Sequence, residues 1–332
     1  MKLMTVFLLL LASPFCWAIQ TYEVSSRHSL FQFLIIAKDH ETPAEALDAF
    51  KKTIFQDPDL MSVYTSEQLA DFQIKKAELI TPNSLRPRVL VLANRGYDIS
   101  NQEKDKSQQR VDRFYKNLKQ QNDLIVLPVG MTARFSAKER QQFFKQMNDQ
   151  FQGLLALGGA DVDPDLYHAE NEHAIDINSV RDRLEFEIIK SWLSFKKGFT
   201  FGVCRGHQMI AAAMGFKLAQ HIENHGHEKF KNHAVRILST TQNFLKELTA
   251  GDREIVNSYH HQAVLAQAHP DVDIAAVSLD GTVEALESKD GRIFSTQFHY
   301  EFMTNLFSKN IFSKINFHLK RQLAPRCQSL FF

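Results

Sequence analysis

The stretch Phe199-Thr-Phe-Gly-Val-Cys-Arg-Gly-His207 decides the fold. Its first five residues, Phe199-Thr-Phe-Gly-Val203, are rich in aromatic and β-branched side chains, which is typical of a short strand. Cys204 follows between Gly202 and Gly206, and a helical pattern starts directly after it. Glycines permit the sharp turn that this arrangement requires. The stretch therefore predicts a strand, a tight turn that presents Cys204, and a helix.

Short apolar runs alternate with helical patterns in the sequence before this turn. The runs and patterns cover residues 88–93, 103–121, 124–127, 153–157 and 181–197. Strands separated by helices of this length predict an α/β fold with a mostly parallel sheet flanked by helices. After the turn, Asp280-Gly281 and Asp290-Gly291 lie between apolar runs and predict hairpins. We therefore expect antiparallel additions to the sheet.

The first 18 residues have the pattern of an export signal. Lys2 is their one charged residue, an apolar run covers residues 6–12, and Cys16-Trp-Ala18 supplies the small residues of a cleavage site. The run is shorter than the ~20 residues that a membrane-spanning helix needs. We expect cleavage after Ala18, no membrane insertion of the mature chain, and an exported (periplasmic or secreted) protein.

The rest of the chain divides into three parts. Residues 19–86 predict a helical N-terminal extension, because Thr42-Pro-Ala-Glu45 has the form of a capping box with proline at the first helical position. Residues 87–322 hold the strand–helix pattern and are the predicted main domain. Residues 323–332 are a predicted C-terminal tail.

Composition excludes several classes of function. The chain of 332 residues has 39 Lys and Arg against 38 Asp and Glu, with no basic run, so nothing predicts binding to nucleic acid. Three cysteines are too few for a disulfide framework. His225-Gly-His227 is not accompanied by a paired carboxylate or a cysteine cluster at ligand spacing, so we expect no metal and no cofactor. A small-molecule substrate remains, and a homo-oligomer stays open.

The segment that follows the last predicted strand supplies two partners for Cys204. His299 and Glu301 stand two positions apart, so in an extended segment they lie on one face and the carboxylate can orient the imidazole. The order Cys204, His299, Glu301 gives a nucleophile, a base and its orienter. The helix start after Cys204 favours a thiolate and leaves the N–H of Arg205 to stabilise an oxyanion.

From residue 88 to about residue 320, the chain resembles the class I glutamine amidotransferase-like superfamily, and within it the γ-glutamyl-γ-aminobutyrate hydrolase family. The stretches that carry the resemblance are Gly158-Gly-Ala-Asp-Val-Asp-Pro164, Arg181-Asp182, Phe201-Gly-Val-Cys-Arg-Gly-His-Gln208, Val256-Asn-Ser-Tyr-His-His-Gln262, Asp280-Gly-Thr-Val-Glu-Ala285 and Gln297-Phe-His-Tyr-Glu301. The resemblance implies a flavodoxin-like sheet. It also implies that a cysteine nucleophile hydrolyses a small-molecule γ-glutamyl amide and releases glutamate.

The resemblance further implies roles for single residues. Gly159 would give a second oxyanion donor beside the N–H of Arg205. The implied substrate-binding residues are Gln208, Asn257, Ser258, Tyr259 and His260. The chain departs from the family's pattern at Tyr300, where proline is usual between the histidine and the glutamate.

Three other functions stay open from the sequence. A non-catalytic protein that binds γ-glutamyl ligands would use the same fold. A glutaminase would deliver ammonia to a separate synthase. A secreted peptidase would cut γ-linked glutamyl chains.

Overall fold

The computed structural model describes residues 20–25, 32–38, 40–56, 71–76, 86–93, 113–223 and 231–323. The predicted export signal, residues 1–18, and nearly all of the predicted C-terminal tail lie outside these residues. Within the described residues, no helix is long and apolar enough to cross a membrane.

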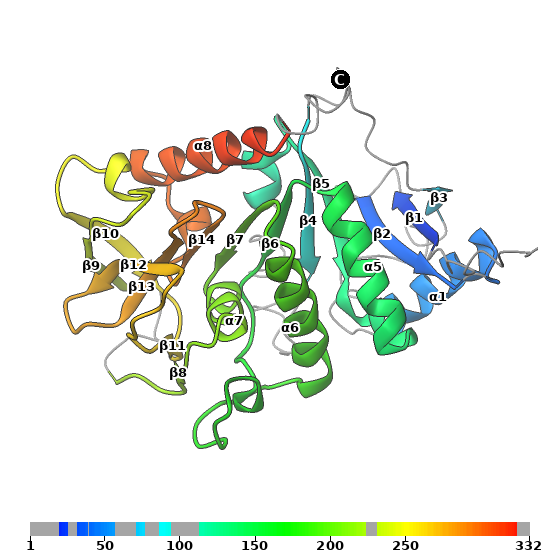
Figure 1. Ribbon diagram of the computed structural model, residues 1–332, viewed down its shortest axis with the longest axis horizontal. Helices are drawn as coiled ribbons and strands as arrows, with labels where there is room; N and C mark the ends of the chain where they lie inside the picture. Colours follow the sequence, from blue (N-terminus) through cyan, green and yellow to red (C-terminus); the bar gives the residue numbers. More distant parts are fainter. Residues whose placement is uncertain are drawn as a thin grey trace, which may run out of the picture.

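One mixed sheet organises the described part of the chain (Figure 1). The strands of its parallel centre are β14 (Ile293–Thr296), β7 (Phe199–Val203), β6 (Gly153–Ala156), β4 (Arg88–Ala93) and β5 (Asp123–Pro128). The antiparallel strands beyond β14 are β13 (Val283–Ser288), β12 (Val272–Ser278), β9 (Lys231–Ile237) and β10 (Arg253–Ser258), with the short strands β8 (Leu218–Ala219) and β11 (Ala263–Val264) beside β13. The predicted α/β class with a parallel centre and antiparallel additions is confirmed.

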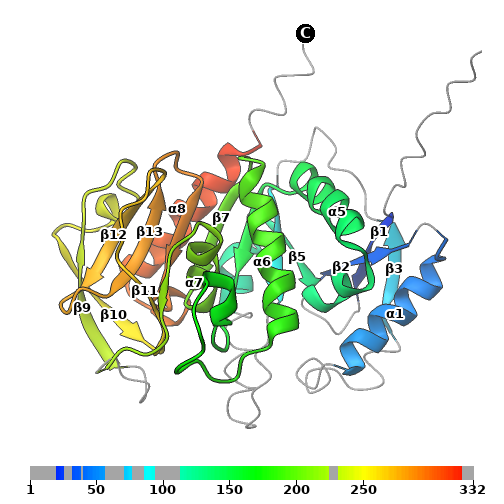
Figure 2. The same ribbon diagram turned by 60° about the horizontal axis from the view of Figure 1, so that its bottom comes forward.

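Helices cover both faces of this sheet and form two cores. The helices are α1 (Pro43–Gln56), α5 (Ala137–Gln150), α6 (Ser179–Ser194), α7 (Arg205–Ala213) and α8 (Leu306–Arg321). Figure 2 shows α5, α6 and α7 in front of the sheet and α8 behind it. Phe312 of α8 packs with Phe199 and Phe201 of β7, whereas Leu154 of β6 packs with the helices on the other face. Strand side chains alternate between the two faces and so supply both cores.

The segment predicted as a helical extension is mixed, and that prediction was wrong. It holds three strands besides α1, namely β1 (Gln20–Ser25), β2 (Gln32–Ala37) and β3 (Gln73–Lys76). α1 does begin at the predicted capping box, where the N–H of Thr42 donates to Oε2 of Glu45 at 2.7 Å. β2 pairs parallel with β5, and β1 joins β2 to β3, so the segment extends the main sheet. The apolar run 33–37 is buried, as a strand covered on both faces requires.

Candidate active site

Cys204 stands in a strained turn between β7 and α7, here called the cysteine turn (residues 202–206). Its backbone has φ 53° and ψ −111°, a conformation that residues with a side chain rarely adopt. A Cβ added at Gly202 would lie 2.6 Å from Cδ1 of Ile210, and one at Gly206 would collide with the carbonyl oxygen of Ala156. Both flanking positions therefore require glycine.

Neighbouring strands bring His299 to Cys204. β14 lies parallel to β7, with Thr296 opposite Val203. The N–H of Cys204 donates to the carbonyl oxygen of Thr296 at 2.8 Å. His299 follows the end of β14 by three residues. The carboxyl ends of two adjacent strands thus hold the two residues that the sequence predicts to react together.

Both the ring and the backbone of His299 are held by protein groups. Oε1 of Glu301, in the short helix η4 (Tyr300–Phe302), lies 2.6 Å from Nδ1 of His299, and both side chains are buried. The N–H of His299 donates to Oδ1 of Asn257, and its carbonyl oxygen accepts from Nδ2 of Asn257, each at 2.8 Å. These contacts leave Nε2 as the ring nitrogen available to Cys204.

The surroundings of His299 raise its pKa. Burial alone would lower the pKa of the imidazole, but the charges of Glu301 and then Cys204 outweigh burial and raise the pKa of His299 to about 9. His299 is therefore protonated at neutral pH. Nε2 makes no hydrogen bond of ordinary geometry with any described residue, and Sγ of Cys204 lies 3.8 Å from the carbonyl oxygen of Tyr259. The sulfur of Cys204 acts on the pKa of His299, so the two side chains are in loose contact, as is common in active sites without substrate.

The two groups predicted to stabilise an oxyanion lie at the same edge of the sheet. β6 pairs parallel with β7, with Ala156 opposite Gly202, and Gly159 follows the end of β6 by three residues. Arg205 is the first residue of α7, and the N–H groups of a helix's first turn have no partner within the helix. Gly159 and Arg205 therefore both lie at the edge of the sheet that holds Cys204.

A buried ionic network behind the cysteine turn joins its surroundings. The fully buried guanidinium of Arg205 donates to Oδ1 of Asp182 at 2.8 Å and to Glu185 at 2.6 Å. Arg181 also donates to Oδ1 of Asp182, at 2.7 Å. Oδ2 of Asp182 accepts from the backbone N–H of Asp163 at 3.0 Å. Asp182 thus connects α7 to the loop after β6. Arg181-Asp182 is one of the stretches that carry the family resemblance, but the sequence alone does not show which residues these two contact.

Two of the residues predicted to bind substrate are bonded to protein groups. Asn257 holds the backbone of His299. Gln208 is buried, and its Nε2 donates to the carbonyl oxygen of Gln262 at 2.9 Å and to Oε1 of Gln297 at 3.1 Å. Both amides therefore have a structural role that the sequence did not predict.

The other three predicted substrate residues follow Asn257 along the chain. Ser258 and His260 are buried, and Nδ1 of His260 lies 3.0 Å from the carbonyl oxygen of Gln262. Tyr259 is half-buried, and its ring centroid lies 6.4 Å from that of His299. Tyr259 thus combines exposed surface with a position beside the reacting groups.

Other histidines near this edge pair with acids. Nε2 of His261 lies 2.8 Å from Asp161, and Nε2 of His233 lies 3.0 Å from Glu284. Burial would lower the pKa of His233, but Glu284 outweighs burial and raises it. In the part of the chain that the structure describes, no group of three or more His, Cys, Asp or Glu could hold a metal ion. His225-Gly-His227 lies outside that part.

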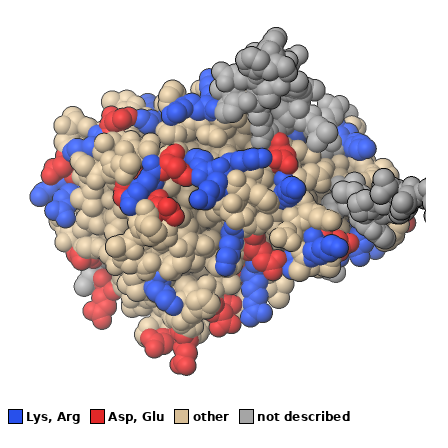
Figure 3. All heavy atoms as spheres, in the orientation of Figure 1, with Lys and Arg blue, Asp and Glu red and all other residues tan. Residues whose placement is uncertain are grey.

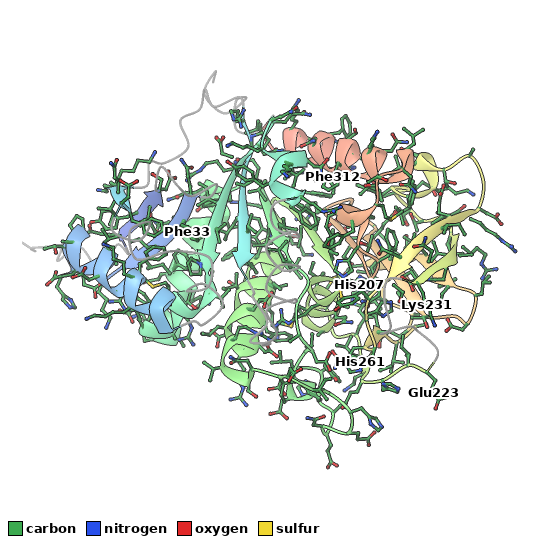
Figure 4. The ribbon with its side chains drawn as sticks, turned by 180° about the vertical axis from the view of Figure 1, so that it is seen from behind. Phe33, His207, Glu223, Lys231, His261 and Phe312 are labelled. Carbon is green, nitrogen blue, oxygen red and sulfur yellow. The ribbon has the colours of Figure 1, made fainter. Side chains whose placement is uncertain are left out.

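Tyr300 anchors the turn between the histidine and the glutamate. Its fully buried ring packs edge-on against Phe114, with centroids 5.6 Å apart, and against Phe312 of α8, at 5.1 Å. Figure 4 labels Phe312 beside α8. The carbonyl oxygen of Tyr300 accepts from Oγ of Ser308 at 2.7 Å. Aromatic packing therefore holds the turn that the ring of a proline would otherwise restrain.

The motifs around these residues match one family over most of the main domain. Residues 97–301 match peptidase C26. The chain belongs to the peptidase C26 family. This family lies within the class I glutamine amidotransferase-like superfamily, so the resemblance seen in the motifs is confirmed.

Several proteins are similar to this member of the C26 family. Protein NtpR of Enterococcus hirae is 36% identical over 192 residues, which are 53% of this chain and 74% of NtpR. The glutamine amidotransferase-like protein YvdE of Lactococcus lactis is 30% identical over 203 residues, which are 57% of this chain and 79% of YvdE. The crystal structure of a glutamine amidotransferase from Thermotoga maritima superposes with a TM-score of 0.46 and 16% identity, over 72% of this chain and 98% of that one.

Proposed function

We propose that the chain is a cysteine hydrolase that cleaves γ-glutamyl amide bonds and releases glutamate. The observation that carries the proposal is a cysteine in a positive-φ turn that interacts with a buried His299–Glu301 pair. Membership of the C26 family supports a hydrolase, and the motifs that resemble γ-glutamyl hydrolases support the substrate class. Cys204 forms no disulfide with any described residue, as a nucleophile requires.

In the proposed reaction, Sγ of Cys204 attacks the carbonyl carbon of the γ-glutamyl amide. The N–H groups of Gly159 and Arg205 stabilise the oxyanion that forms. The C–N bond then breaks, and His299 gives the Nε2 proton to the leaving amine, which leaves a thioester on Cys204. Water attacks the thioester while His299 takes a proton from it, and the C–S bond breaks to release glutamate and restore the thiolate. A histidine that is protonated at neutral pH suits the first of these steps.

The test measures glutamate released from glutamine, γ-glutamyl-γ-aminobutyrate and γ-glutamyl peptides, with Cys204→Ala as the control. The parent should release glutamate from at least one substrate, and the variant from none. A parent that binds γ-glutamyl compounds but releases no glutamate would instead be a non-catalytic binding protein.

The similarity to YvdE favours a second candidate function, that of a glutaminase acting with a separate synthase. The same chemistry would then release ammonia from glutamine for the partner. This candidate predicts release of glutamate from glutamine alone, with no cleavage of larger γ-glutamyl amides. The panel of substrates therefore separates the two functions.

We also propose that the chain is exported and loses its first 18 residues. The apolar run 6–12 and the small residues before Ile19 support this. Mass spectrometry of protein recovered from outside the cytoplasm should find Ile19 first and no Cys204–Cys327 disulfide, because a bridge would block the nucleophile. An intact Met1 would contradict the proposal.

A further inference from the structure

A groove of about 490 Å³ opens beside His299. It lies between the outer face of the β9–β10 hairpin (the β9–β10 face) and the turn that follows η4. The side chains that line it include Asn232, Ile255 and Asn257 on the first wall, and Phe302, Met303 and Asn305 on the second. These side chains are amides and apolar groups, and the groove is open to solvent, with Ile255 56% exposed.

The groove adjoins residues that contact His299. Asn257 makes both hydrogen bonds to the backbone of His299, and the ring of Phe302 lies 5.7 Å from the imidazole. Tyr259, two residues beyond Asn257, has its carbonyl oxygen against Sγ of Cys204. In the proposed reaction the leaving amine takes its proton from His299, so a substituent on that amine has to extend away from Cys204 past His299. The groove, whose walls include Asn257 and Phe302, can receive that substituent.

The β9–β10 face changes character along its length. Side chains alternate along a strand, and residues opposite one another in an antiparallel pair share a face. From His299 outward, the opposed pairs on this face are Asn257 with Asn232, Ile255 with Ala234, and Arg253 with Arg236. The face therefore presents amides first, then apolar side chains, and finally two guanidinium groups.

The two arginines at the outer end have no acidic partner among the described residues. Both are exposed, and neither side chain forms an ion pair or hydrogen bond with any residue that the structure describes. Glu254, their nearest acidic neighbour in the strand, points to the opposite face. Figure 3 shows both basic and acidic side chains at the end of the molecule that holds β9 and β10. Like charges directly opposed across two strands repel, and an anion bound between them would relieve the repulsion.

We propose that the β9–β10 face is a leaving-group subsite, an inference that rests on the proposed function. It selects γ-glutamyl amides whose leaving amine carries an anionic group at the far end of an apolar chain. Asn257 and Arg253 are four positions apart, a span of about 13 Å along a strand. An extended 8-aminooctanoate spans about 10 Å and brings its carboxylate within reach of both arginine side chains. 4-Aminobutanoate spans about 5 Å, so its carboxylate lies over Ile255, where it loses water and gains no counter-charge.

The test compares two matched pairs of substrates by their kcat/KM. One pair is γ-glutamyl-8-aminooctanoate and its neutral analogue γ-glutamyl-8-aminooctanamide. The other is γ-glutamyl-4-aminobutanoate and γ-glutamyl-4-aminobutanamide. In the long pair the carboxylate should be preferred by about tenfold, the effect of charge-assisted contacts at a solvent-exposed site. In the short pair the carboxylate should have no advantage.

Variants then assign the preference to the two arginines. The double variant Arg236→Gln, Arg253→Gln should reduce the preference in the long pair to about onefold, because neutral side chains hold both substrates alike. The preference is a ratio within one preparation, so it does not depend on how much of the variant is folded. Arg321→Gln removes an exposed arginine at the end of α8 and should change neither the ratio nor the activity.

Each other outcome has a definite meaning. Equal cleavage of the long pair, or a preference that survives loss of both arginines, would overturn this inference and leave the proposed function intact. No cleavage of any γ-glutamyl amide, glutamine included, would overturn the proposed function and this inference with it.

Discussion

Oε1 of Glu301 lies 2.6 Å from Nδ1 of His299, and this contact is the main reason why a fully buried imidazole stays protonated at neutral pH. Burial opposes the charge on the ring, and Glu301 and Cys204 together outweigh it, with Glu301 as the largest favourable contribution. The same contact fixes which ring nitrogen faces Cys204. Glu301 therefore sets both the charge and the direction of the proposed acid.

Glu301→Gln should lower the pKa of His299 and slow the reaction. The amide keeps the size of the side chain but removes the negative charge, so the imidazole loses its proton at a lower pH. We expect a fall in kcat of about 10²- to 10⁴-fold, smaller than the effect of losing Cys204. The alkaline limb of the pH–rate profile should also move to lower pH. An unchanged alkaline limb would show that His299 does not act through its protonated form.

The raised pKa of His299 also links stability to pH. The folded pKa, about 9, lies above the reference value of 6.5, so the folded state holds the proton more tightly. This contribution to stability is complete below about pH 6.5 and is lost as the pH rises through about 9. Its size is about 3 kcal/mol.

Urea unfolding of the parent and of His299→Gln at about pH 6 and about pH 9.5 measures this contribution. Other titrating groups are common to both proteins and cancel in the difference. The advantage of the parent in free energy of unfolding should shrink at the higher pH. A difference that is equal at both values would contradict the linkage.

Substitutions at Cys204 separate chemistry from backbone strain. Cys204→Ala should fold normally and lose turnover by on the order of 10⁴-fold or more, because no other described group stands where the acyl intermediate forms. Cys204→Gly should be equally inactive but more stable than Cys204→Ala by about 1 kcal/mol, since glycine adopts a φ of 53° without a steric penalty. Glutamate release and urea unfolding test the two statements. Near-parent hydrolysis by Cys204→Ala would refute the mechanism.

The sequence predicted the residues of the cysteine turn and its partners because their signals are local. Two glycines around Cys204 mark a turn with no room for side chains, and the close approach of Ala156 and Ile210 shows why. His299 and Glu301 likewise follow the same strand, so their spacing alone predicts that their side chains lie together. The hairpin signal Asp280-Gly281 is equally local. In the structure it joins the antiparallel strands β12 and β13.

Other features depend on partners distant in the sequence and could not be predicted in this way. The amide of Asn257 could bind either substrate or protein, and only the fold shows that it holds the backbone of His299. The strand β2 is a short apolar run whose state depends on whether β5 lies beside it. A capping box at Thr42 correctly predicted one helix, but it carries no information about the strands before and after that helix.

Asp182→Asn should affect both stability and catalysis. The change leaves the buried charges of Arg181 and Arg205 with Glu185 as their one remaining carboxylate, which costs about 3–5 kcal/mol of stability. It also weakens the contact with the N–H of Asp163, which positions the loop that follows Gly159. We therefore expect kcat to fall by about tenfold with little change in KM.

Glu185→Gln is the matched control for Asp182→Asn. It removes a carboxylate from the same network but keeps the hydrogen bond to the N–H of Asp163, so its kcat should fall less at a similar loss of stability. Urea unfolding and steady-state kinetics on one γ-glutamyl substrate measure both quantities. Equal kcat in the two variants would show that Asp182 contributes to stability but not to catalysis.

Tyr300 tests whether packing can replace a proline between the histidine and the glutamate. Its hydroxyl is buried with no hydrogen-bond partner among the described residues, so Tyr300→Phe should keep full activity and gain up to about 1 kcal/mol of stability. Tyr300→Ala removes the ring from between Phe114 and Phe312, which should cost about 3–5 kcal/mol. It should also lower kcat, because Glu301 then lies in a less restrained turn.

Tyr300→Pro separates the two ways of holding this turn. Proline restrains the backbone but fills little of the aromatic pocket, so stability should fall while activity per folded molecule stays close to that of the parent. Urea unfolding gives the folded fraction, and glutamate release from one γ-glutamyl amide gives the activity. If the parent is inert and Tyr300→Pro hydrolyses the substrate, then the tyrosine has displaced Glu301 from its working position, and the natural chain is a binding protein that has lost its chemistry.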